Sequence, residues 1–253
     1  MTRQRVIWIT GASSGIGEAL ALEYTRRGNI VYGSARSADK LNDVRERSKS
    51  AKGTFHPVTA DVCDLDALKR AYQSIQAQSG TPDLVILNAG THKPTSALEF
   101  SLADHRSLIE INYMGVLNCM DIILPSFLER RSGQIAIVSS VAGYRGLPKA
   151  SGYGASKAAL INFCESIREE LKSQNVDLRM VNPGFVKTPL TDLNEFPMPF
   201  LMPVDDAVRA MIKGLESKKF EITFPATFAF LMKLLRRLPT FIHMAITRKI
   251  VGS

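Results

Sequence analysis

Short apolar runs alternate with longer stretches of helical spacing through most of this chain, and this alternation limits the folds that it can adopt. Strands that alternate with helices, without a repeat or a linker, are typical of one parallel sheet with right-handed crossovers. We therefore predict one doubly wound α/β domain of about seven parallel strands with helices on both faces. The predicted strands are residues 6–9, 30–35, 54–59, 83–87, 134–138, 176–181 and 220–224.

The stretches between these strands have the apolar spacing of amphipathic helices. The predicted helices are residues 18–27, 39–52, 65–79, 102–130, 153–172 and 204–217. Pro125 lies inside one of them, and we expect it to kink or end that helix because proline has no backbone N–H. We assign residues 1–225 to the domain and 226–253 to a basic, amphipathic C-terminal extension.

A glycine-rich turn joins the first predicted strand to the first helix. It has the sequence Gly11-Ala-Ser-Ser-Gly15-Ile-Gly17. Glycine allows positive φ and a close approach of the backbone to a ligand. The helix that follows presents free N–H groups and a positive dipole end, which suit a phosphate. The spacing is GxxxGxG instead of GxGxxG, and a plain tight turn is the alternative.

Arg36 follows the second predicted strand directly, and no carboxylate occurs before Asp39. In dinucleotide sites an acidic residue at this corner binds the ribose 2′-OH, whereas a basic residue accommodates a 2′-phosphate. The corner therefore favours NADP over NAD. The alternative is that Arg36 is an ordinary surface residue.

Tyr153 and Lys157 are four residues apart at the start of a predicted helix, so they share one face. A free phenol has a pKa of about 10, and a nearby positive charge lowers that pKa. Ser140 lies thirteen residues before Tyr153, at the end of the strand 134–138. Strand ends that face helix starts are where open α/β sheets place their chemistry. The alternative is a helix surface that carries an unrelated Tyr and Lys.

Taken in order, these motifs resemble the short-chain dehydrogenase/reductase family, in its smaller single-domain branch. Each motif is modest alone, but their joint occurrence in the family's order is specific, and it implies a Rossmann-like fold. The matching residues are Thr10 to Gly17, Asp61-Val62, Asn88-Ala-Gly90, Asn112, Ser139-Ser140, Tyr153 with Lys157, and Pro183-Gly184 with Thr188.

The resemblance implies an NADP(H) site along the carboxyl ends of the strands. The residues that it implies are Gly11, Ser13, Ser14, Gly15 and Ile16 on the pyrophosphate and adenosine side, Arg36 at the 2′-phosphate, Asp61 and Val62 beside the adenine, Asn88, Ala89 and Gly90 under the adenosine ribose, and Pro183, Gly184, Val186 and Thr188 at the nicotinamide end.

The resemblance also implies four catalytic residues. Tyr153 is expected to exchange a proton with the substrate oxygen, and Lys157 to lower the pKa of Tyr153 and to bind the nicotinamide ribose. Ser140 is expected to hydrogen-bond the developing alkoxide. Asn112 is expected to hold a water that relays protons to Lys157, and its alternative is a core amide that bends a helix. The family's thirteen-residue gap selects Ser140 over Ser139, which should point to the other side of an extended chain.

Two segments are expected to contact the substrate. Residues 189–203 are rich in proline, methionine and aromatic residues, and we expect them to form a lid over an apolar substrate. Their alternative is packing on the core or at a subunit contact. Residues 141–147 should form another wall, to which Tyr144 and Leu147 add apolar surface and Arg145 offers a partner for an anionic group.

Charge is concentrated in the tail. The chain has a formal charge of +8, and no acidic residue occurs from Ile222 to the end. We expect one apolar helical stripe, with basic residues opposite it and Pro239 dividing the tail. The stripe comprises Phe228, Leu231, Leu235 and Leu238, and the basic residues are Lys233, Arg236 and Arg237. Such a helix suits an anionic membrane surface, and the open alternatives are the protein's own pocket or a partner subunit.

The same tail replaces the short Gly-rich segment that supports a tetramer in many family members. A homodimer through residues 102–124 and 155–171 is therefore expected in place of the tetramer. No nucleic-acid motif accompanies the basic residues, and no run of 18 or more uncharged apolar residues indicates a spanning helix. The three widely spaced cysteines suit a reducing compartment. We expect a cytoplasmic protein, with peripheral contact to the inner face of a membrane through 226–253.

The resemblance predicts an NADP(H)-dependent oxidoreductase that interconverts a carbonyl and a secondary alcohol on an apolar, lipid-like or steroid-like substrate. The alternative is a non-catalytic NADP-binding redox sensor or scaffold. Tyr153 argues against that alternative because a binding protein needs no acid/base group. A membrane-surface adaptor that acts mainly through its tail is a third interpretation.

Overall fold

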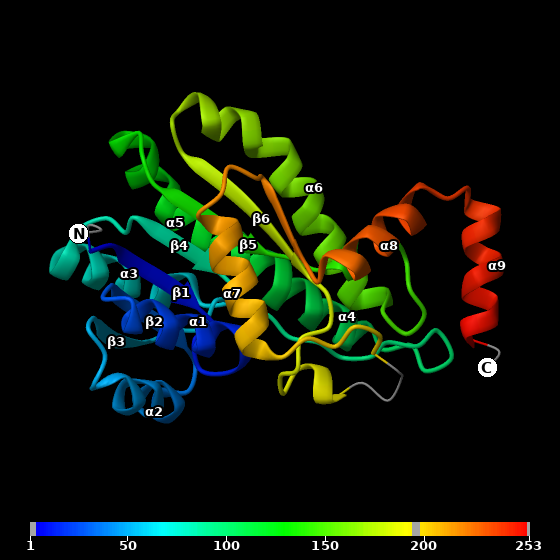
Figure 1. Cartoon of the computed structure of the whole chain (residues 1–253), viewed down its shortest axis with the longest axis horizontal. Coiled ribbons are helices and arrows are strands. Elements are labelled where there is room, and N and C mark those ends of the chain that lie inside the picture. The colour runs from blue at the N-terminus through cyan, green and yellow to red at the C-terminus, as the bar shows by residue number, and fades with distance from the viewer. Residues whose placement is uncertain (1–3, 194–197, 252–253) are drawn as a thin grey trace.

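Seven parallel strands form the centre of the part of the chain that the computed structural model describes, residues 4–193 and 198–251 (Figure 1). Every predicted strand is present, and its bounds lie within two residues of the prediction. The strands are β1 (Val6–Thr10), β2 (Ile30–Ala35), β3 (Thr54–Thr59), β4 (Leu84–Leu87), β5 (Gln134–Val138), β6 (Asp177–Pro183) and β7 (Glu221–Phe224). Their order across the sheet is β3-β2-β1-β4-β5-β6-β7.

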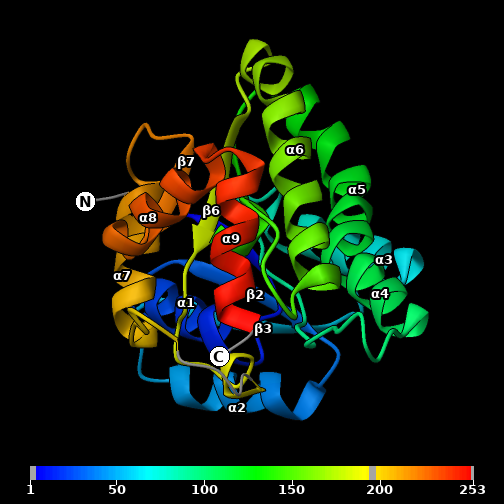
Figure 2. The same ribbon diagram turned by 90° about the vertical axis from the view of Figure 1, so that its right-hand side faces the viewer.

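Helices cover both faces of this sheet (Figure 2). One layer contains α1 (Gly15–Arg26), α2 (Ala38–Ser48) and α7 (Val204–Leu215), and the other contains α3 (Leu65–Ser79), α4 (Leu102–Ile109), α5 (Gly115–Arg130) and α6 (Ser151–Ser173). The tail forms α8 (Ala226–Arg237) and α9 (Thr240–Val251). The sheet thus has an apolar core on each face, as a doubly wound fold requires.

The chain reverses direction across the sheet between β1 and β4. After β1 it adds β2 and β3 on one side, and then returns to β4 on the other side of β1. Loops that leave neighbouring strands toward opposite faces open a crevice at the carboxyl ends. The glycine-rich turn after β1 and the Asn88-Ala-Gly90 segment after β4 both lie at this point.

The helical region from Leu102 to Arg130 combines α4, a π-helical turn at Glu110–Met114, and α5. It is long and apolar enough to cross a membrane by composition alone, but Ile123 and Phe127 are fully buried in the core beside the sheet. We predicted that Pro125 would kink or end a helix. It does not end one, because α5 continues through it to Arg130. The π-helical turn was not predicted.

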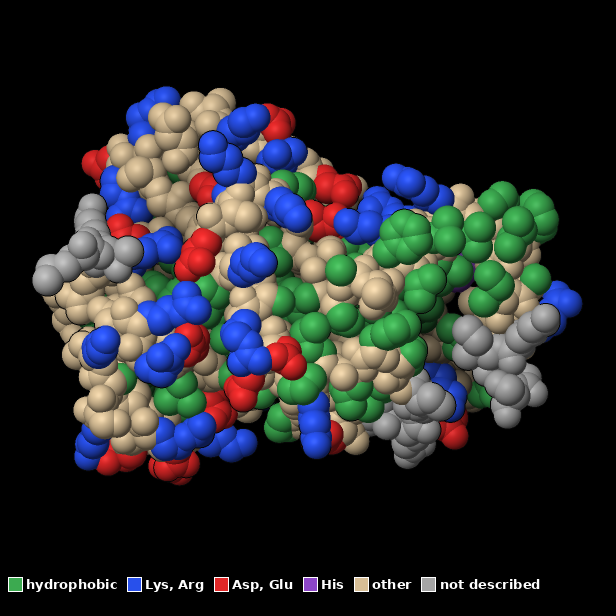
Figure 3. Space-filling model, in the orientation of Figure 1, with side chains coloured by type: hydrophobic (Ala, Val, Ile, Leu, Met, Phe, Trp, Pro, Cys, Tyr) green, Lys and Arg blue, Asp and Glu red, His purple; other side chains and the backbone are tan. Residues whose placement is uncertain are grey.

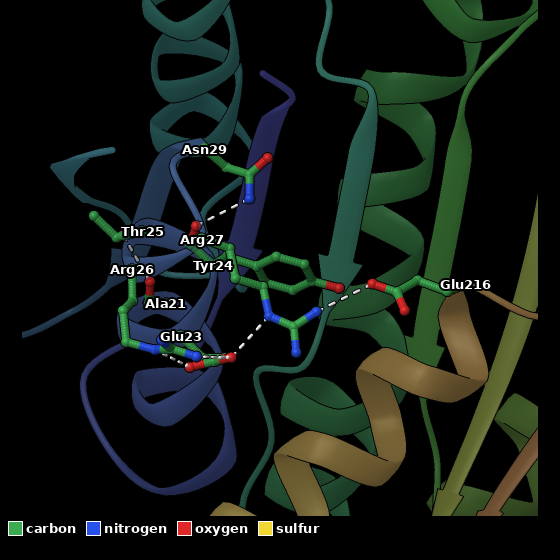
Figure 4. A network of polar contacts seen from close by, with 8 residues as sticks. All are labelled: Ala21, Glu23, Tyr24, Thr25, Arg26, Arg27, Asn29 and Glu216. Carbon is green, nitrogen blue, oxygen red and sulfur yellow. Dashed lines mark hydrogen bonds and ion pairs between the residues drawn. The ribbon is translucent and has the colours of Figure 1, made fainter. Parts of the chain in front are cut away.

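Polar contacts join the end of α1 to the end of α7 (Figure 4). The Arg27 guanidinium binds the Glu23 carboxylate at 2.7 Å and the Glu216 carboxylate at 3.1 Å. The Asn29 amide donates to the carbonyl oxygen of Tyr24 at 2.9 Å. Exposed ion pairs of this kind contribute about 0–1 kcal/mol each, so burial of the apolar faces holds the two helices against the sheet.

The buried face of α8 agrees only in part with the predicted stripe, because Phe228 and Leu235 pack against the core but Leu231 does not. α8 packs on the core through Phe228, Ala229 and Met232, whereas Leu231 is half exposed. The basic side is also not free, because Lys233 binds the carboxylate of Glu221. Arg236 lies 3.9 Å from the carboxylate of Glu165. Pro239 does separate two helices, as predicted.

A side chain at Gly17 would disturb this architecture directly. A Cβ built on Gly17 would lie 2.2 Å from the Gly11 carbonyl oxygen and 2.5 Å from Asn88 Nδ2. We predict that Gly17→Ala lowers the free energy of unfolding by about 1–3 kcal/mol, the usual cost of overpacking. Gly146→Ala is the control, because no heavy atom lies within 4 Å of its Cβ position. Urea unfolding measures both, and equal stabilities of the two variants would contradict the prediction.

Candidate active site

The glycine-rich turn is tied to the loop after β4 by reciprocal hydrogen bonds. Thr10 Oγ1 accepts the backbone N–H groups of Asn88 at 3.0 Å and of Ala89 at 3.1 Å. The Asn88 amide donates to the carbonyl oxygens of Thr10 and Gly11 at 3.1 and 3.3 Å. Asn88 therefore holds the two loops together at the crevice.

The turn has the shape that a phosphate cradle needs. Gly11 and Gly15 have φ angles of 70° and 56°, a region that favours glycine. Ser14 precedes α1, and its side chain makes no capping hydrogen bond, so the N–H groups of the first turn are left available. A Cβ on Gly15 would lie 3.2 Å from Thr188 Cγ2, which brings the segment after β6 against the turn. These residues fit the pyrophosphate of a dinucleotide.

The residues predicted for the adenosine end follow β2 and β3. Arg36 is exposed and forms no ion pair with the described residues. Asp61 Oδ1 accepts the backbone N–H of Cys63 at 3.0 Å, and the Val62 carbonyl oxygen accepts the Asn118 amide at 2.9 Å. β2 and β3 are adjacent in the sheet, so Arg36 and Asp61 leave it side by side. Ser13 and Ile16 lie in and after the glycine turn and are partly buried.

Tyr153 and Lys157 lie on one face of α6, which begins at Ser151, two residues before the predicted start. Lys157 Nζ is 5.7 Å from the centre of the Tyr153 ring and donates to the Val138 carbonyl oxygen at 3.0 Å. The Lys157 side chain is buried, and this burial lowers its pKa to about 8.

The pKa of Tyr153 does not follow the prediction. Burial raises it, and a hydrogen bond with the Ser140 side chain acts in the opposite direction without cancelling the rise. Desolvation of the phenolate is the largest influence on this pKa, and the nearby Lys157 ammonium makes its hydrogen bond to Val138. The protein therefore holds Tyr153 as a neutral phenol at pH 7, which is the form that donates a proton.

The two serines at the end of β5 point in different directions, as the extended backbone predicts. Ser140 Oγ accepts the backbone N–H of Ala142 at 3.1 Å and lies 3.4 Å from the carbonyl oxygen of Pro183. Ser139 Oγ instead donates to the Lys157 carbonyl oxygen at 2.8 Å. Only Ser140 is directed at the Tyr153 phenol, while Ser139 attaches α6 to the sheet.

Asn112 is fully buried in the π-helical turn, and its contacts bridge two elements. Its Oδ1 accepts the Thr91 N–H at 2.7 Å, and its Nδ2 donates to the Thr91 carbonyl oxygen and to Ser156 Oγ at 3.0 Å each. A Cβ on Gly90 would lie 3.1 Å from Asn112 Oδ1 and 3.5 Å from Lys157 Nζ. Asn112 therefore holds the loop after β4 against α6, close to Lys157.

The segment after β6 forms the other end of the predicted cofactor site. The Gly184 N–H donates to the Phe224 carbonyl oxygen at 2.7 Å, and that of Thr188 donates to Thr191 Oγ1 at 3.0 Å. Val186 is buried and pairs with Met202. Pro183, at the end of β6, lies beside Ser140. The segment thus runs from Ser140 to the glycine turn.

The structure describes part of the predicted lid at residues 189–203. The Phe200 ring lies 6.0 Å from that of Phe228 on α8, which in turn stacks on Phe185 at 5.3 Å. Phe196 and its neighbours at 194–197 lie outside the described residues. Phe200 and Leu201 remain substantially exposed, so this segment presents an apolar surface next to α8.

The substrate wall predicted at residues 141–147 differs from the prediction at Tyr144. Tyr144 is buried, and its hydroxyl donates to the Glu221 carboxylate on β7, so it faces away from a substrate. A groove of about 920 Å³ lies instead between residues 145–148 and α9, with Leu147 and Met244 among its lining residues. His243 Nε2 bonds the Gly146 carbonyl oxygen at 3.0 Å and holds α9 there. Sequence patterns did not indicate His243, because its partner is 97 residues away.

Comparison with known proteins agrees with this geometry. A family model described as short chain dehydrogenase matches residues 5–196. An uncharacterized oxidoreductase of Myxococcus xanthus (strain DK1622) is 38% identical over 246 residues, which cover 97% of each chain. A 3-oxoacyl-(acyl-carrier-protein) reductase of Thermotoga maritima is 31% identical over 188 residues, 74% of this chain and 76% of the relative.

A solved structure extends the likeness to nearly the whole fold. A short chain dehydrogenase from Burkholderia cenocepacia J2315, in complex with NADP, superposes with a TM-score of 0.82 and 28% identity. The superposition covers 96% of this chain and 97% of the other.

The buried Lys157 makes a prediction about stability and pH. Its folded pKa of about 8 lies below the ordinary value of about 10.4, so unfolding takes up a proton between these pH values. Stability should therefore rise with pH in that window, by up to about 1.4 kcal/mol per pH unit. Lys157→Met should remove this rise, measured as urea unfolding between about pH 8 and pH 9.5.

Lys172→Met is the matched control, because Lys172 is exposed on the same helix. That variant should retain the wild-type dependence on pH. If Lys157→Met and the wild type have parallel curves, the ammonium is not desolvated in solution.

Proposed function

This chain belongs to the short-chain dehydrogenase family, and on that premise we propose that it is an NADP(H)-dependent oxidoreductase that interconverts a carbonyl compound and a secondary alcohol. One observation carries the proposal. The partly buried Tyr153 phenol hydrogen-bonds Ser140 beside the Lys157 ammonium, at the sheet edge that also holds the glycine turn. A module that only bound a nucleotide would have no use for a proton donor there.

In the proposed reduction, Tyr153 donates its phenolic proton to the substrate oxygen. NADPH, when bound, supplies the hydride for the carbonyl carbon. Ser140 donates a hydrogen bond to the oxygen as negative charge develops, which lowers the barrier by oxyanion-type stabilisation. The resulting phenolate is stabilised by the Lys157 ammonium, 5.7 Å from the ring centre. Asn112 and Lys157 meet at Gly90, where a replacement proton would enter.

The proposed preference for NADP(H) rests on Arg36. It leaves the end of β2 at the corner where ribose recognition occurs, and it has no ionic partner among the described residues. A guanidinium that forms no ion pair with the described residues is free to form charge-assisted hydrogen bonds with a 2′-phosphate. The relative that was solved with NADP shares the fold and supports the choice.

The proposed substrate is apolar, with room for a sizeable body. The groove between residues 145–148 and α9 has a volume typical of a small-molecule site, and Leu147 and Met244 line it. Phe200 and Leu201 add apolar surface from the lid segment. Arg145 and Arg248 also line the groove, so a substrate with a polar or anionic end is compatible with it.

We predict that Tyr153→Phe abolishes turnover. General acid catalysis contributes about 10²–10⁴-fold, and the phenyl ring retains the shape of the side chain but not its proton. NADPH affinity should stay within a few-fold. Carbonyl compounds are screened with the wild type by NADPH absorbance, and the variant is assayed on the best one. Tyr113→Phe, partly buried on the π-helical turn, is the control. Unchanged activity in Tyr153→Phe would refute the mechanism.

We predict that Arg36→Ala weakens NADPH binding about 10- to 100-fold, because a hydrogen bond to a charged group contributes about 1.5–3 kcal/mol. NADH affinity should change by less than about twofold. Titration of each nucleotide by fluorescence gives both dissociation constants. Arg70→Ala on the surface of α3 is the control and should alter neither constant. Equal losses for the two nucleotides would show that Arg36 does not recognise the 2′-phosphate.

A further inference from the structure

The two tail helices expose large apolar side chains, which we call the tail face. On α8 and α9 these side chains have exposed fractions between 36% and 75%, so they are not part of the core. The tail face consists of Phe230, Leu231, Leu234, Phe241, Ile242, Met244 and Ile246. Figure 3 shows hydrophobic side chains gathered over α8 and the start of α9. Isolated exposed apolar residues are ordinary, but a gathered set marks an interaction site.

The core does not explain these side chains. α8 already buries Phe228, Ala229 and Met232 against the domain, and the tail face lies on its remaining surface. A helix that is apolar on its inner face normally carries polar residues on its outer face. Phe230 is 67% exposed and Phe241 is 75% exposed, which is unusual for phenylalanine unless something covers the ring.

The charged residues within the two tail helices have one sign. No acidic residue occurs from Ile222 to the end of the chain. Lys233 and Arg236 form ion pairs within the protein, with Glu221 and Glu165 respectively. Arg237 and Arg248 are exposed and form no ion pair with the described residues. The surface that covers the tail face is therefore expected to be apolar at the centre of the contact and anionic at its edge.

We propose that the tail face docks on the surface of an anionic lipid bilayer. A bilayer with anionic headgroups supplies both properties, because apolar side chains enter the acyl boundary while cations meet the headgroups. A second copy of this chain fits less well, since a symmetric interface would bring Arg237 and Arg248 toward the same cations of the partner.

The helices lie on the bilayer and do not cross it. α8 has 12 residues, so it is about 18 Å long, well below the ~30 Å of a hydrocarbon core. α9 has the same length. Helices of this kind lie in the interface plane with their apolar side chains about 5–10 Å deep.

Docking has a consequence for the groove. α9 lines it through His243 and Met244, so a docked tail face holds the groove at the lipid surface. An apolar substrate would then reach it from the bilayer. This consequence rests on the proposed function, whereas the docking itself does not.

Co-sedimentation with vesicles tests the proposal. The full-length protein is mixed at low salt with phosphatidylcholine vesicles that contain or lack phosphatidylglycerol. We expect binding to the anionic vesicles only. Leu234→Glu should lower the partition coefficient at least about tenfold, because a half-exposed leucine loses its burial in the bilayer. Leu98→Glu is the matched control, since Leu98 is 96% exposed outside the tail.

A second pair of variants tests the charge. Arg237→Gln should lower the partition coefficient about fivefold, the effect of one basic residue near an anionic surface. Lys213→Gln should have no effect, because Lys213 is exposed on α7. Added salt should weaken binding of the wild type. All four substitutions are at exposed positions, and circular dichroism confirms folding.

Three results would overturn the docking. The first is failure of the wild type to sediment with anionic vesicles at low salt. The second is equal loss of binding in Leu234→Glu and Leu98→Glu. The third is a dimer, seen by light scattering, that Leu234→Glu dissociates while vesicle binding is absent, which would assign the tail face to a second copy. None of these results depends on turnover, so they leave the oxidoreductase assignment untouched.

Discussion

The buried ammonium of Lys157 is the interaction on which the rest of the candidate active site depends. A desolvated charge is costly, and here the Val138 carbonyl oxygen is its hydrogen-bond partner at 3.0 Å. α6 must therefore stay in register with β5, and Ser139 enforces this by bonding the Lys157 carbonyl oxygen. Once that register is set, Tyr153 and Ser140 meet without further adjustment.

Much of this arrangement could be predicted because it is encoded locally. The strand bounds follow from apolar runs, and the Tyr153–Lys157 pair follows from four-residue spacing on one helix. The different directions of Ser139 and Ser140 follow from the alternation of an extended chain. The place where these parts meet follows from the parallel sheet, whose strands all end at one edge.

The predictions that failed concern distant partners. The direction of the Tyr153 pKa depends on how completely the fold buries the phenol. Tyr144 was expected in the substrate wall, but it binds Glu221, 77 residues away. α8 buries Met232 and leaves Leu231 half exposed, because its position against the core decides which side chains are covered. No local pattern indicated the π-helical turn that carries Asn112.

The residues around Tyr153 are set by local sequence, whereas the groove beside α9 is set by a distant contact. Tyr153 and the glycine turn are set by short motifs in the domain, so their positions do not depend on contacts with the tail. The groove, in contrast, depends on a distant contact, because His243 on α9 bonds the Gly146 carbonyl oxygen at its other side. A change in the tail would therefore alter the groove without altering the contacts of Tyr153 with Ser140 and Lys157. Under the proposed function, substrate choice would depend on α9, which lines the groove, as much as on the domain.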